Sequence, residues 1–299
     1  MSTQFDSVSV VIPAFNRADS LPRAIGSALN QTCVPAEIIV VDDASTDLTP
    51  ALMLEQTHPR VRYVRLRQNG GAPRARNTGT RLARGRWIAF LDADDEWLPH
   101  KLERQLDAMT SAGDPGFCVS NLLARNDAGE EHTWNTHEPP HAAENLSHFL
   151  MVEGGALQTS TLLVRRDLAL AHPFAEDLQK HQDWDLMLRL AASGQPWVYV
   201  ADPLSVYVMD NNPQRISRSR PNVNITLDWL RASPHVSQEA AAYFFARHCF
   251  GRALRQLGTR CTRVLFELGM RSPAAARGLT RGLRDLAMSR ARLMVGRPA

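Results

Sequence analysis

The first hundred residues alternate between short apolar runs and segments whose apolar residues recur at helical spacing. Four runs predict strands: Val8–Pro13, Glu37–Val41, Val61–Leu66 and Trp87–Leu91. Four segments predict helices: Ser20–Asn30, Thr46–Gln56, Arg74–Arg84 and Pro99–Thr110. The first, second and fourth runs are nearly continuous in Val, Ile, Leu and Phe, which is typical of strands covered on both faces. Their alternation with helices predicts an α/β fold built from parallel βαβ units.

The remaining pattern is less regular and ends in a helical tail. Further strands are predicted at Phe117–Leu123, Thr161–Val164 and Trp197–Val200, a helix at Asp183–Ala192, a surface loop at Asn126–Pro140 and a linker at Met209–Pro221. Beyond the linker, Gln238–Leu257 carries an apolar stripe through Phe245, Cys249, Ala253 and Leu257, and Ala274–Val295 carries one through Leu279, Leu283, Leu286 and Leu293. Such stripes predict amphipathic helices. We therefore expect a domain over residues 1–215 and an Arg-rich helical tail over residues 216–299.

Charge separates the same two parts. Met1–Gln214 holds 18 Lys and Arg against 27 Asp and Glu, a net −9, whereas Arg215–Ala299 holds 16 Arg against 4 acids, a net +12. A basic tail on an acidic body predicts an anionic partner, most simply a membrane surface, although a solvated Arg-rich face stays an alternative. Few aromatic residues are interleaved with the arginines, so no nucleic acid is expected.

The cysteines and the apolar stretches indicate the cellular compartment of the protein. The four cysteines form no C-x-x-C pair, so neither a zinc site nor a disulfide framework is predicted. The opening MSTQFDSVSVVIPAFNR lacks a basic region before its apolar run, and no stretch reaches the ~18 apolar residues that a membrane span needs. We expect a cytoplasmic protein, with peripheral attachment at the inner face of the cell membrane.

Polar residues follow each early strand at its carboxyl end: Ala14-Phe15-Asn16, Asp42-Asp43, Asn69-Gly70-Gly71 and Asp92-Ala93-Asp94-Asp95. Ligands of open α/β sheets bind outside the carboxyl ends of the strands, so the four clusters predict one binding edge. Asp92 and Asp94 are two residues apart in an extended segment and point to the same face. Two carboxylates there favour a hard divalent cation that also takes phosphate oxygens, which suits a nucleotide diphosphate. An acidic turn ahead of a helix is the structural alternative.

Five stretches together resemble the family 2 glycosyltransferases with the GT-A fold: SVVIPAFNR (Ser9–Arg17), IIVVDDAST (Ile38–Thr46), NGGAPRARNTG (Asn69–Gly79), IAFLDADDEWLP (Ile88–Pro99) and HQDWDLMLRL (His181–Leu190). The resemblance implies a Rossmann-like, mostly parallel sheet flanked by helices, with a C-terminal helical extension. It implies inverting transfer of one sugar from a nucleotide diphosphate sugar to a hydroxyl. It also implies bound Mn²⁺ or Mg²⁺ at Asp92 and Asp94.

The resemblance assigns roles to individual residues. The donor would lie against Pro13, Ala14, Phe15, Asn16, Asp43, Arg76, Asp92 and Ala93. Asp43 would accept a hydrogen bond from the base, and because a carboxylate suits the imide N–H of uracil, a UDP-sugar is favoured. Arg76 would offset the charge of the diphosphate. The alternatives are helix capping for Asp42 and Asp43, and an exposed helix position for Arg76.

Asp183 matches the general base of the family, which removes the proton of the acceptor hydroxyl. The alternative is an N-cap at a helix start, and Asp185 and His181 are the next candidates for the base. Gln182 stands where the family more often has Glu, which removes a charge beside the base. The Q-x-x-R-W segment of processive members is absent, so transfer of a single sugar is favoured.

Several aromatic and histidine residues stay without a role. Trp184 either stacks on an acceptor sugar or belongs to the core. A metal site at His132, His137, His141 and His148 is disfavoured, because Pro139 and Pro140 separate the two histidines that are four residues apart.

The predicted function is thus metal-dependent sugar transfer to a glycan or lipid-linked acceptor in surface polysaccharide biosynthesis. A sugar-phosphate nucleotidyltransferase is a weaker alternative, because no Gly-rich basic loop follows the first strand. A catalytically degenerate scaffold protein is another.

Overall fold

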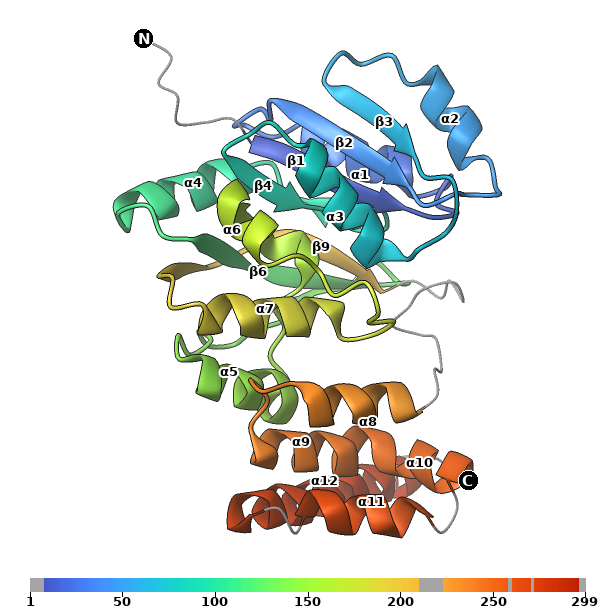
Figure 1. Ribbon diagram of the computed structural model, residues 1–299, viewed down its shortest axis with the longest axis vertical. Coiled ribbons are helices and arrows are strands. Elements are labelled where there is room, and N and C mark those ends of the chain that lie inside the picture. Colours follow the sequence, from blue (N-terminus) through green and yellow to red (C-terminus); the bar gives the residue numbers. More distant parts are fainter. Residues whose placement is uncertain (1–7, 210–222, 258–259, 270–271, 296–299) are drawn as a thin grey trace. The chain divides into compact units, whose positions relative to one another are not determined.

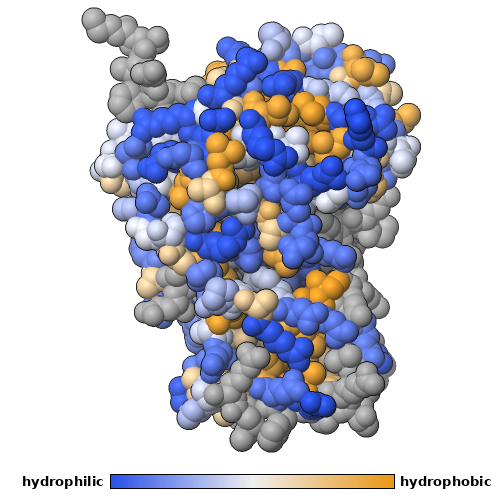
Figure 2. Space-filling model, in the orientation of Figure 1, coloured by the Kyte–Doolittle hydropathy of each residue, from blue (hydrophilic) through white to orange (hydrophobic). Residues whose placement is uncertain are grey.

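The computed structural model describes residues 8–209, 223–257, 260–269 and 272–295 (Figure 1). Contacts between residues divide the chain into two compact units. The first unit consists of Met1–Glu138 and Ala156–Pro213, and the second, which we call the helical unit, consists of Pro139–Gly155 and Gln214–Ala299. On the face drawn in Figure 2, hydrophilic residues take up most of the described surface, with apolar residues in smaller patches between them.

The first unit is built on one sheet in the strand order β3-β2-β1-β4-β8-β6-β9-β5, with β7 paired to β6. Four parallel strands make up its first half: β1 (Val8–Ala14), β2 (Glu37–Asp42), β3 (Val61–Arg65) and β4 (Trp87–Phe90). The second half contains β5 (Glu96–Trp97), β6 (Phe117–Asn126), β7 (Glu131–Thr133), β8 (Leu162–Arg165) and β9 (Trp197–Met209).

Strand directions bring six carboxyl ends to one edge of this sheet. β8 runs antiparallel to both β4 and β6, so β6 is parallel to β4, and β9 is parallel to β6. The carboxyl ends of β1, β2, β3, β4, β6 and β9 therefore point the same way. That edge is where ligands of α/β sheets bind, and it carries the polar clusters singled out in the sequence.

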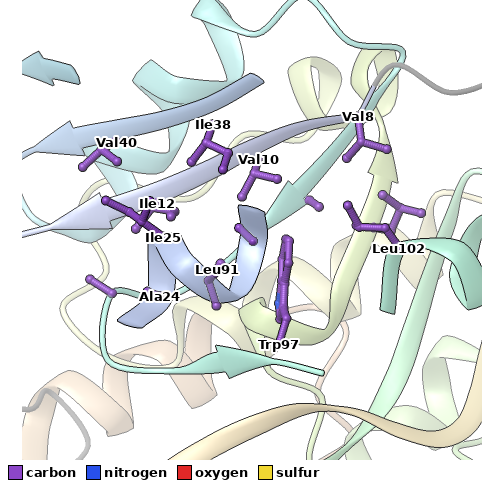
Figure 3. Packing of buried hydrophobic residues seen from close by; sticks show 14 of the residues in the cluster. Val8, Val10, Ile12, Ala24, Ile25, Ile38, Val40, Leu91, Trp97 and Leu102 are labelled. Carbon is purple, nitrogen blue, oxygen red and sulfur yellow. The ribbon is translucent and has the colours of Figure 1, made fainter. Parts of the chain in front are cut away.

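Helices cover both faces of the sheet: α1 (Leu21–Leu29), α2 (Thr49–Glu55), α3 (Ala72–Leu82), α4 (Lys101–Ser111), α6 (Arg166–Ala171) and α7 (Gln182–Ala192). In Figure 1, α3 and α6 lie in front of the sheet and α1 behind it. Behind the sheet, alternate residues of β1 and β2 pack with α1, α4 and Trp97 in a buried apolar cluster (Figure 3).

The helix α3 packs unusually close to β1. A Cβ atom built on Gly79 would lie 2.3 Å from Cγ1 of Val11, which is closer than such atoms approach. The glycine thus permits the contact between helix and strand. Because Arg76 lies one turn earlier on α3, this contact also fixes the height of Arg76 above the sheet.

The expected strands and helices of the first hundred residues are present, with bounds that differ by up to three residues. The middle of the chain differs in several places, and the helices α5 (Ala143–His148) and α6 and the short strand β5 were not expected. The loop expected at Asn126–Pro140 contains the exposed strand β7, which pairs with the end of β6. The strand expected at Trp197–Val200 continues as β9 to Met209, and the rest of the expected linker Met209–Pro221 lies outside the described residues.

The helical unit contains α5 (Ala143–His148), η1 (Phe149–Glu153), α8 (Val223–Ala232), α9 (Gln238–Phe244), η3 (Phe245–Cys249), α10 (Phe250–Leu257), α11 (Arg260–Gly269) and α12 (Pro273–Val295). Phe245, Cys249 and Ala253 of the predicted stripe are buried. The stripe on α12 is only half-buried at Leu279, Leu283 and Leu286.

Residues 139–155 belong to the helical unit, although the expected boundary at residue 215 placed them in the first domain. Phe149 and Leu150 are buried there, and the backbone N–H of Ser237 donates to Oγ of Ser147 at 3.1 Å. The apolar side of this short segment packs against α9, which its irregular sequence pattern did not reveal. Among the helices that the structure describes, none has the length and apolar character to cross a membrane.

Candidate active site

The loop after β1 is tied to the loop after β2. Asn16 has a left-handed backbone with φ 53°, and its N–H donates to Oγ of Ser45 at 2.9 Å. Its side-chain Oδ1 accepts from the N–H of Thr46 at 2.8 Å. The predicted donor residue Asn16 therefore holds the two loops together. Beside it, Phe15 is 42% exposed, whereas the side chain of Ala14 is buried in the core.

Two other predicted donor residues have buried side chains. Pro13 is buried in β1, and Ala93 is 3% exposed and belongs to the core cluster. Pro13, Ala14 and Ala93 therefore expose very little surface for a donor to contact. Phe15 is the aromatic side chain that this loop offers to a ligand.

Asp42 and Asp43 accept hydrogen bonds from different segments at the carboxyl edge of the sheet. Asp42 is fully buried and accepts from the Tyr63 hydroxyl at 2.5 Å and from the Ser45 N–H at 2.8 Å. Asp43 accepts from the backbone N–H groups of Gly70 and Gly71 at 2.9 and 2.6 Å. Burial raises the pKa of Asp43, while these two N–H groups act to lower it.

Neither aspartate caps the following helix, because α2 begins at Thr49 with Leu48 at its N-cap. The carboxylate of Asp43 instead anchors the loop that leads into α3, whose N-cap is Gly71 with φ 86°. The Asn69-Gly70-Gly71 cluster thus has a structural role that sequence reasoning left open. Each oxygen of Asp43 keeps a further lone pair, so the anchoring leaves its capacity to accept from a base in place.

Arg76 joins two of the predicted functional segments. Its Nη2 donates to Oδ1 of Asp92 at 2.6 Å, and its Nη1 donates to Oε1 of Gln182 at 3.1 Å. The guanidinium is buried and lies 5.1 Å from the ring centre of Phe174. One planar fork thereby connects the end of β4 to the start of α7. The alternative of an exposed helix arginine does not hold.

The Asp92-Ala93-Asp94 turn is fixed from behind by Ser160, which lies in the short 3-10 turn η2 (Thr159–Thr161). The Asp92 N–H donates to Oγ of Ser160 at 3.1 Å, and that hydroxyl donates to Oδ2 of Asp95 at 2.7 Å. Asp95 is therefore part of the turn's support. Sequence reasoning missed Ser160, because its segment has no periodic signal.

Both predicted metal-binding carboxylates have an arginine nearby. Asp92 pairs with Arg76, and Oδ2 of Asp94 lies 3.6 Å from Nη2 of Arg17. The Asp92 side chain is 31% exposed and that of Asp94 is 15% exposed, so both are accessible. Within the described residues, no group of three or more His, Cys, Asp and Glu side chains is arranged to hold a metal ion. A cation here would have to complete its shell with oxygens from outside the protein.

Asp183 is the second residue of α7, and the N-cap is His181. Its Oδ1 accepts the N–H of Trp184 at 2.9 Å. Burial raises the pKa of Asp183, and the charge of Asp92 adds to the rise, while the Trp184 N–H and the charge of Arg76 oppose it. A raised pKa makes this carboxylate a stronger base.

The other two candidates for the base, Asp185 and His181, make contacts within the protein. Asp185 accepts from Nε of Arg189 at 2.8 Å. His181 is buried, has a left-handed backbone with φ 65°, and stacks on Trp184 with the ring centres 5.5 Å apart. Burial lowers the pKa of His181 to about 3, so its ring is neutral at ordinary pH.

The histidines in and after the expected loop lie on different elements. His132 is on β7 and stacks on Trp134, whereas His148 at the end of α5 lies 3.7 Å from Glu153. His137 contacts Thr136.

Comparisons with known proteins decide the family. The model of "Glycosyl transferase family 2" matches residues 9–169. The chain belongs to this family. It is thus a glycosyltransferase, as the resemblance of the five motifs implied, and the α/β fold of that resemblance is confirmed.

Relatives and a solved structure agree with this assignment. "Amylovoran biosynthesis glycosyltransferase AmsB" of Erwinia amylovora is 32% identical over 244 residues, which cover 78% of this chain and 79% of that protein. "Succinoglycan biosynthesis protein ExoO" of Rhizobium meliloti is 49% identical over 115 residues, which cover 38% of this chain and only 33% of that protein. The structure of S. aureus TarS with UDP-GlcNAc has a TM-score of 0.64 at 16% identity and covers 96% of this chain and 92% of that chain, a likeness of fold alone.

Proposed function

We propose that this protein transfers one sugar from a UDP-sugar to a glycan or lipid-linked hydroxyl during surface polysaccharide synthesis, with inversion at the anomeric carbon. The observation that supports this most is the bridge of Arg76 between Asp92 and Gln182. It brings the end of β4, where the donor diphosphate is expected, next to the start of α7, where the expected base lies. The names of AmsB and ExoO, which both refer to biosynthesis of a polysaccharide, support the class of product.

The chemistry follows from the proposed roles. The Asp183 carboxylate takes the proton of the acceptor hydroxyl while the oxygen attacks the anomeric carbon, and the bond from that carbon to the diphosphate oxygen breaks on the opposite face. Arg76 carries a fixed positive charge that offsets the charge on the leaving diphosphate. Raising the pKa of Asp183 by burial favours the proton transfer.

Asp92 and Asp94 are residues of the type that binds a divalent metal. Asp92 and Asp94 are accessible carboxylates, and Mg²⁺ or Mn²⁺ is commonly held by one or two carboxylates together with phosphate oxygens and water. When bound, such an ion would neutralise charge on the diphosphate. Because Arg17 and Arg76 already pair with the two carboxylates, we expect the site to take the metal together with the nucleotide and not before it.

Calorimetry of UDP with and without Mn²⁺ tests the donor site, with GDP and dTDP as comparators. We expect UDP to bind more tightly with Mn²⁺, and Asp94→Ala to abolish that gain. Asp202→Ala is the matched control, because Asp202 is an exposed aspartate on β9 that pairs with Arg104. Equal binding of UDP by the wild type and Asp94→Ala in Mn²⁺ would exclude a role of Asp94 in binding the metal. If the folded wild type bound no nucleotide at all, the proposed sugar transfer would be excluded.

We also propose that the helical unit attaches the enzyme to an anionic membrane surface at the inner face of the cell membrane. On α12, Arg277, Arg281, Arg284 and Met288 recur every three or four residues, which places them on one side of the helix. All four side chains are exposed. Asp285 lies 4.0 Å from Arg281 and 3.5 Å from Arg284, so it offsets part of this charge.

Flotation of the full chain with vesicles containing phosphatidylglycerol tests this attachment. Each arginine near an anionic surface contributes ~1 kcal/mol, so replacing the three arginines of α12 with Gln should weaken binding roughly 100-fold at low salt. The matched control replaces Arg60, Arg62 and Arg67, which are three exposed arginines of the first unit. Equal loss in both variants would mean that only net charge matters and that α12 has no special role.

A further inference from the structure

Three aromatic rings gather on one face of the ribbon formed by β6, β7 and β9. The rings of His132 and Trp134 stack with their centres 6.2 Å apart, and Trp134 meets Tyr207 edge-on at 6.0 Å. Ala124 of β6 is the register partner of both His132 and Tyr207, so these two side chains flank a small residue on the same face. His132 is exposed, and Trp134 and Tyr207 are half-buried. We call these three rings the aromatic platform.

Hydrogen bonds connect the strand of the platform to the Asp92 turn. Ser205 precedes Tyr207 by two residues on β9, so both point to the same face, about 7 Å apart along the strand. The Ser205 hydroxyl donates to the carbonyl of Ser160 at 2.9 Å, and Oγ of Ser160 accepts the N–H of Asp92. Ser205 and Ser160 thus connect the strand that carries Tyr207 to the Asp92 turn.

The strand order separates the platform from the expected base pocket. The expected base pocket lies at the ends of β1 and β2, the Asp92 turn follows β4, and the platform lies beyond β8 on β6 and β9. In an inverting displacement, the acceptor oxygen enters opposite the leaving diphosphate. We therefore expect a ligand that extends away from the nucleotide to reach towards the half of the sheet that carries the platform.

The chemistry of the platform matches a sugar ring. A pyranose has an apolar face of C–H groups that packs on aromatic rings, and hydroxyl groups at its edge that need hydrogen-bond partners. Asn126 and Glu130, which bond to each other at 2.8 Å, lie in register on the same face as Ala124 and His132. The Oδ1 of Asn126 already accepts from the N–H groups of Ala128 and Glu130 at 3.0 Å, so the carboxylate of Glu130 is the main partner that this turn offers to those hydroxyls. The Tyr207 hydroxyl and the His132 ring nitrogens are further polar groups of the platform.

We propose that His132, Trp134 and Tyr207 form a subsite that binds a pyranose ring of the acceptor. This rests on the proposed function and deepens it, because it requires a glycan acceptor with at least one sugar ring beyond the reacting hydroxyl. The alternative acceptor, a lipid phosphate without sugars, has no use for such a platform.

Saturation-transfer NMR with methyl pyranosides and β-linked disaccharides, in saturating UDP, tests the subsite on the full chain. The variants are Trp134→Ala, Trp134→Phe and His132→Ala, and the control is His100→Ala, an exposed histidine on the loop before α4. We expect the wild type to bind at least one pyranoside, and Trp134→Ala to weaken that binding at least tenfold. His132→Ala should weaken it severalfold, while Trp134→Phe stays within threefold and His100→Ala equals the wild type.

Calorimetry of UDP on the same proteins separates a failure of the pyranose subsite from a failure of the proposed function. UDP affinity should stay within twofold in every variant, since the platform lies away from the donor pocket. Undiminished pyranoside binding by His132→Ala and folded Trp134→Ala would overturn the subsite, as would a wild type that binds UDP but no pyranoside. A wild type that fails to bind UDP would overturn the proposed function itself.

Discussion

Lys101 at the start of α4 is fully buried, which is rare for a lysine. Its Nζ donates to Oε1 of Gln105 at 2.6 Å and lies 4.3 Å from the ring centre of Trp97. Burial lowers the pKa of Lys101 from 10.5 to about 7. The charged form is therefore disfavoured in the folded protein, although the Gln105 oxygen and the Trp97 ring partly compensate.

The pKa difference converts into a stability that depends on pH. Below pH 7 the amine is protonated in both states, and the cost of burying its charge is about 5 kcal/mol, from 10.5 to about 7. Between pH 7 and 10.5 the folded state binds fewer protons than the unfolded state, so the free energy of unfolding rises with pH. From pH 6 to pH 9 this residue should add roughly 3 kcal/mol of stability.

Lys101→Met removes the amine and keeps most of the side-chain volume. It leaves Oε1 of Gln105 without this donor, which costs about 1–3 kcal/mol. We expect the variant to be more stable than the wild type by about 2–4 kcal/mol at pH 6, and that advantage to shrink by about 3 kcal/mol at pH 9.

Urea unfolding followed by tryptophan fluorescence measures both quantities, because five of the six tryptophans belong to the first unit and only Trp229 belongs to the helical unit. Lys180→Met is the matched control: Lys180 is the only other lysine of the chain and is not fully buried. Its effect at the two pH values gives the baseline against which the effect of Lys101→Met is compared. An advantage of Lys101→Met that is equal at pH 6 and pH 9 would refute a neutral buried amine.

Three further predictions concern Asp183, Arg76 and Gly79. Asp183→Asn should lower kcat by about 10²–10⁴-fold with unchanged UDP affinity, because only proton removal is lost; a near-normal kcat would assign the base elsewhere. Arg76→Lys keeps the charge but not the fork that reaches Asp92, so kcat should fall about tenfold or more, as steady-state kinetics would show. Gly79→Ala should destabilise by about 1–3 kcal/mol in urea unfolding, since its Cβ would lie 2.3 Å from Val11, and a gain in stability from helix propensity alone would contradict that clash.

The first half of the sheet could be predicted because its strands are continuous apolar runs with helices between them. Parallel order then places the residues after β1, β2 and β4 at one edge. The second half could not be predicted in the same way. β8 enters antiparallel between β4 and β6, and no local pattern encodes the direction in which a strand joins a sheet.

The contacts of individual side chains could not be predicted from the sequence either. Lys101 opens a helix in the same way as a surface lysine would, and only the packing of Trp97 and Gln105 around it shows that it is buried. The link from Arg76 to Gln182 spans 106 positions. Its two ends were each singled out by the resemblance, but their contact depends on how α7 returns to the end of β4.

The contact of Arg76 with Gln182 gives the unusual glutamine a physical meaning. With a glutamate at position 182, the guanidinium would face two carboxylates, and its charge would be compensated by its own neighbours. Gln182 accepts the same kind of hydrogen bond without a charge, so Asp92 is the carboxylate within hydrogen-bond distance of Arg76. More of the positive charge of Arg76 is then available to a diphosphate at this edge. The exchange also removes a negative charge from the residue next to Asp183, the proposed base, where a second carboxylate would raise the pKa of Asp183 further than burial and Asp92 already do.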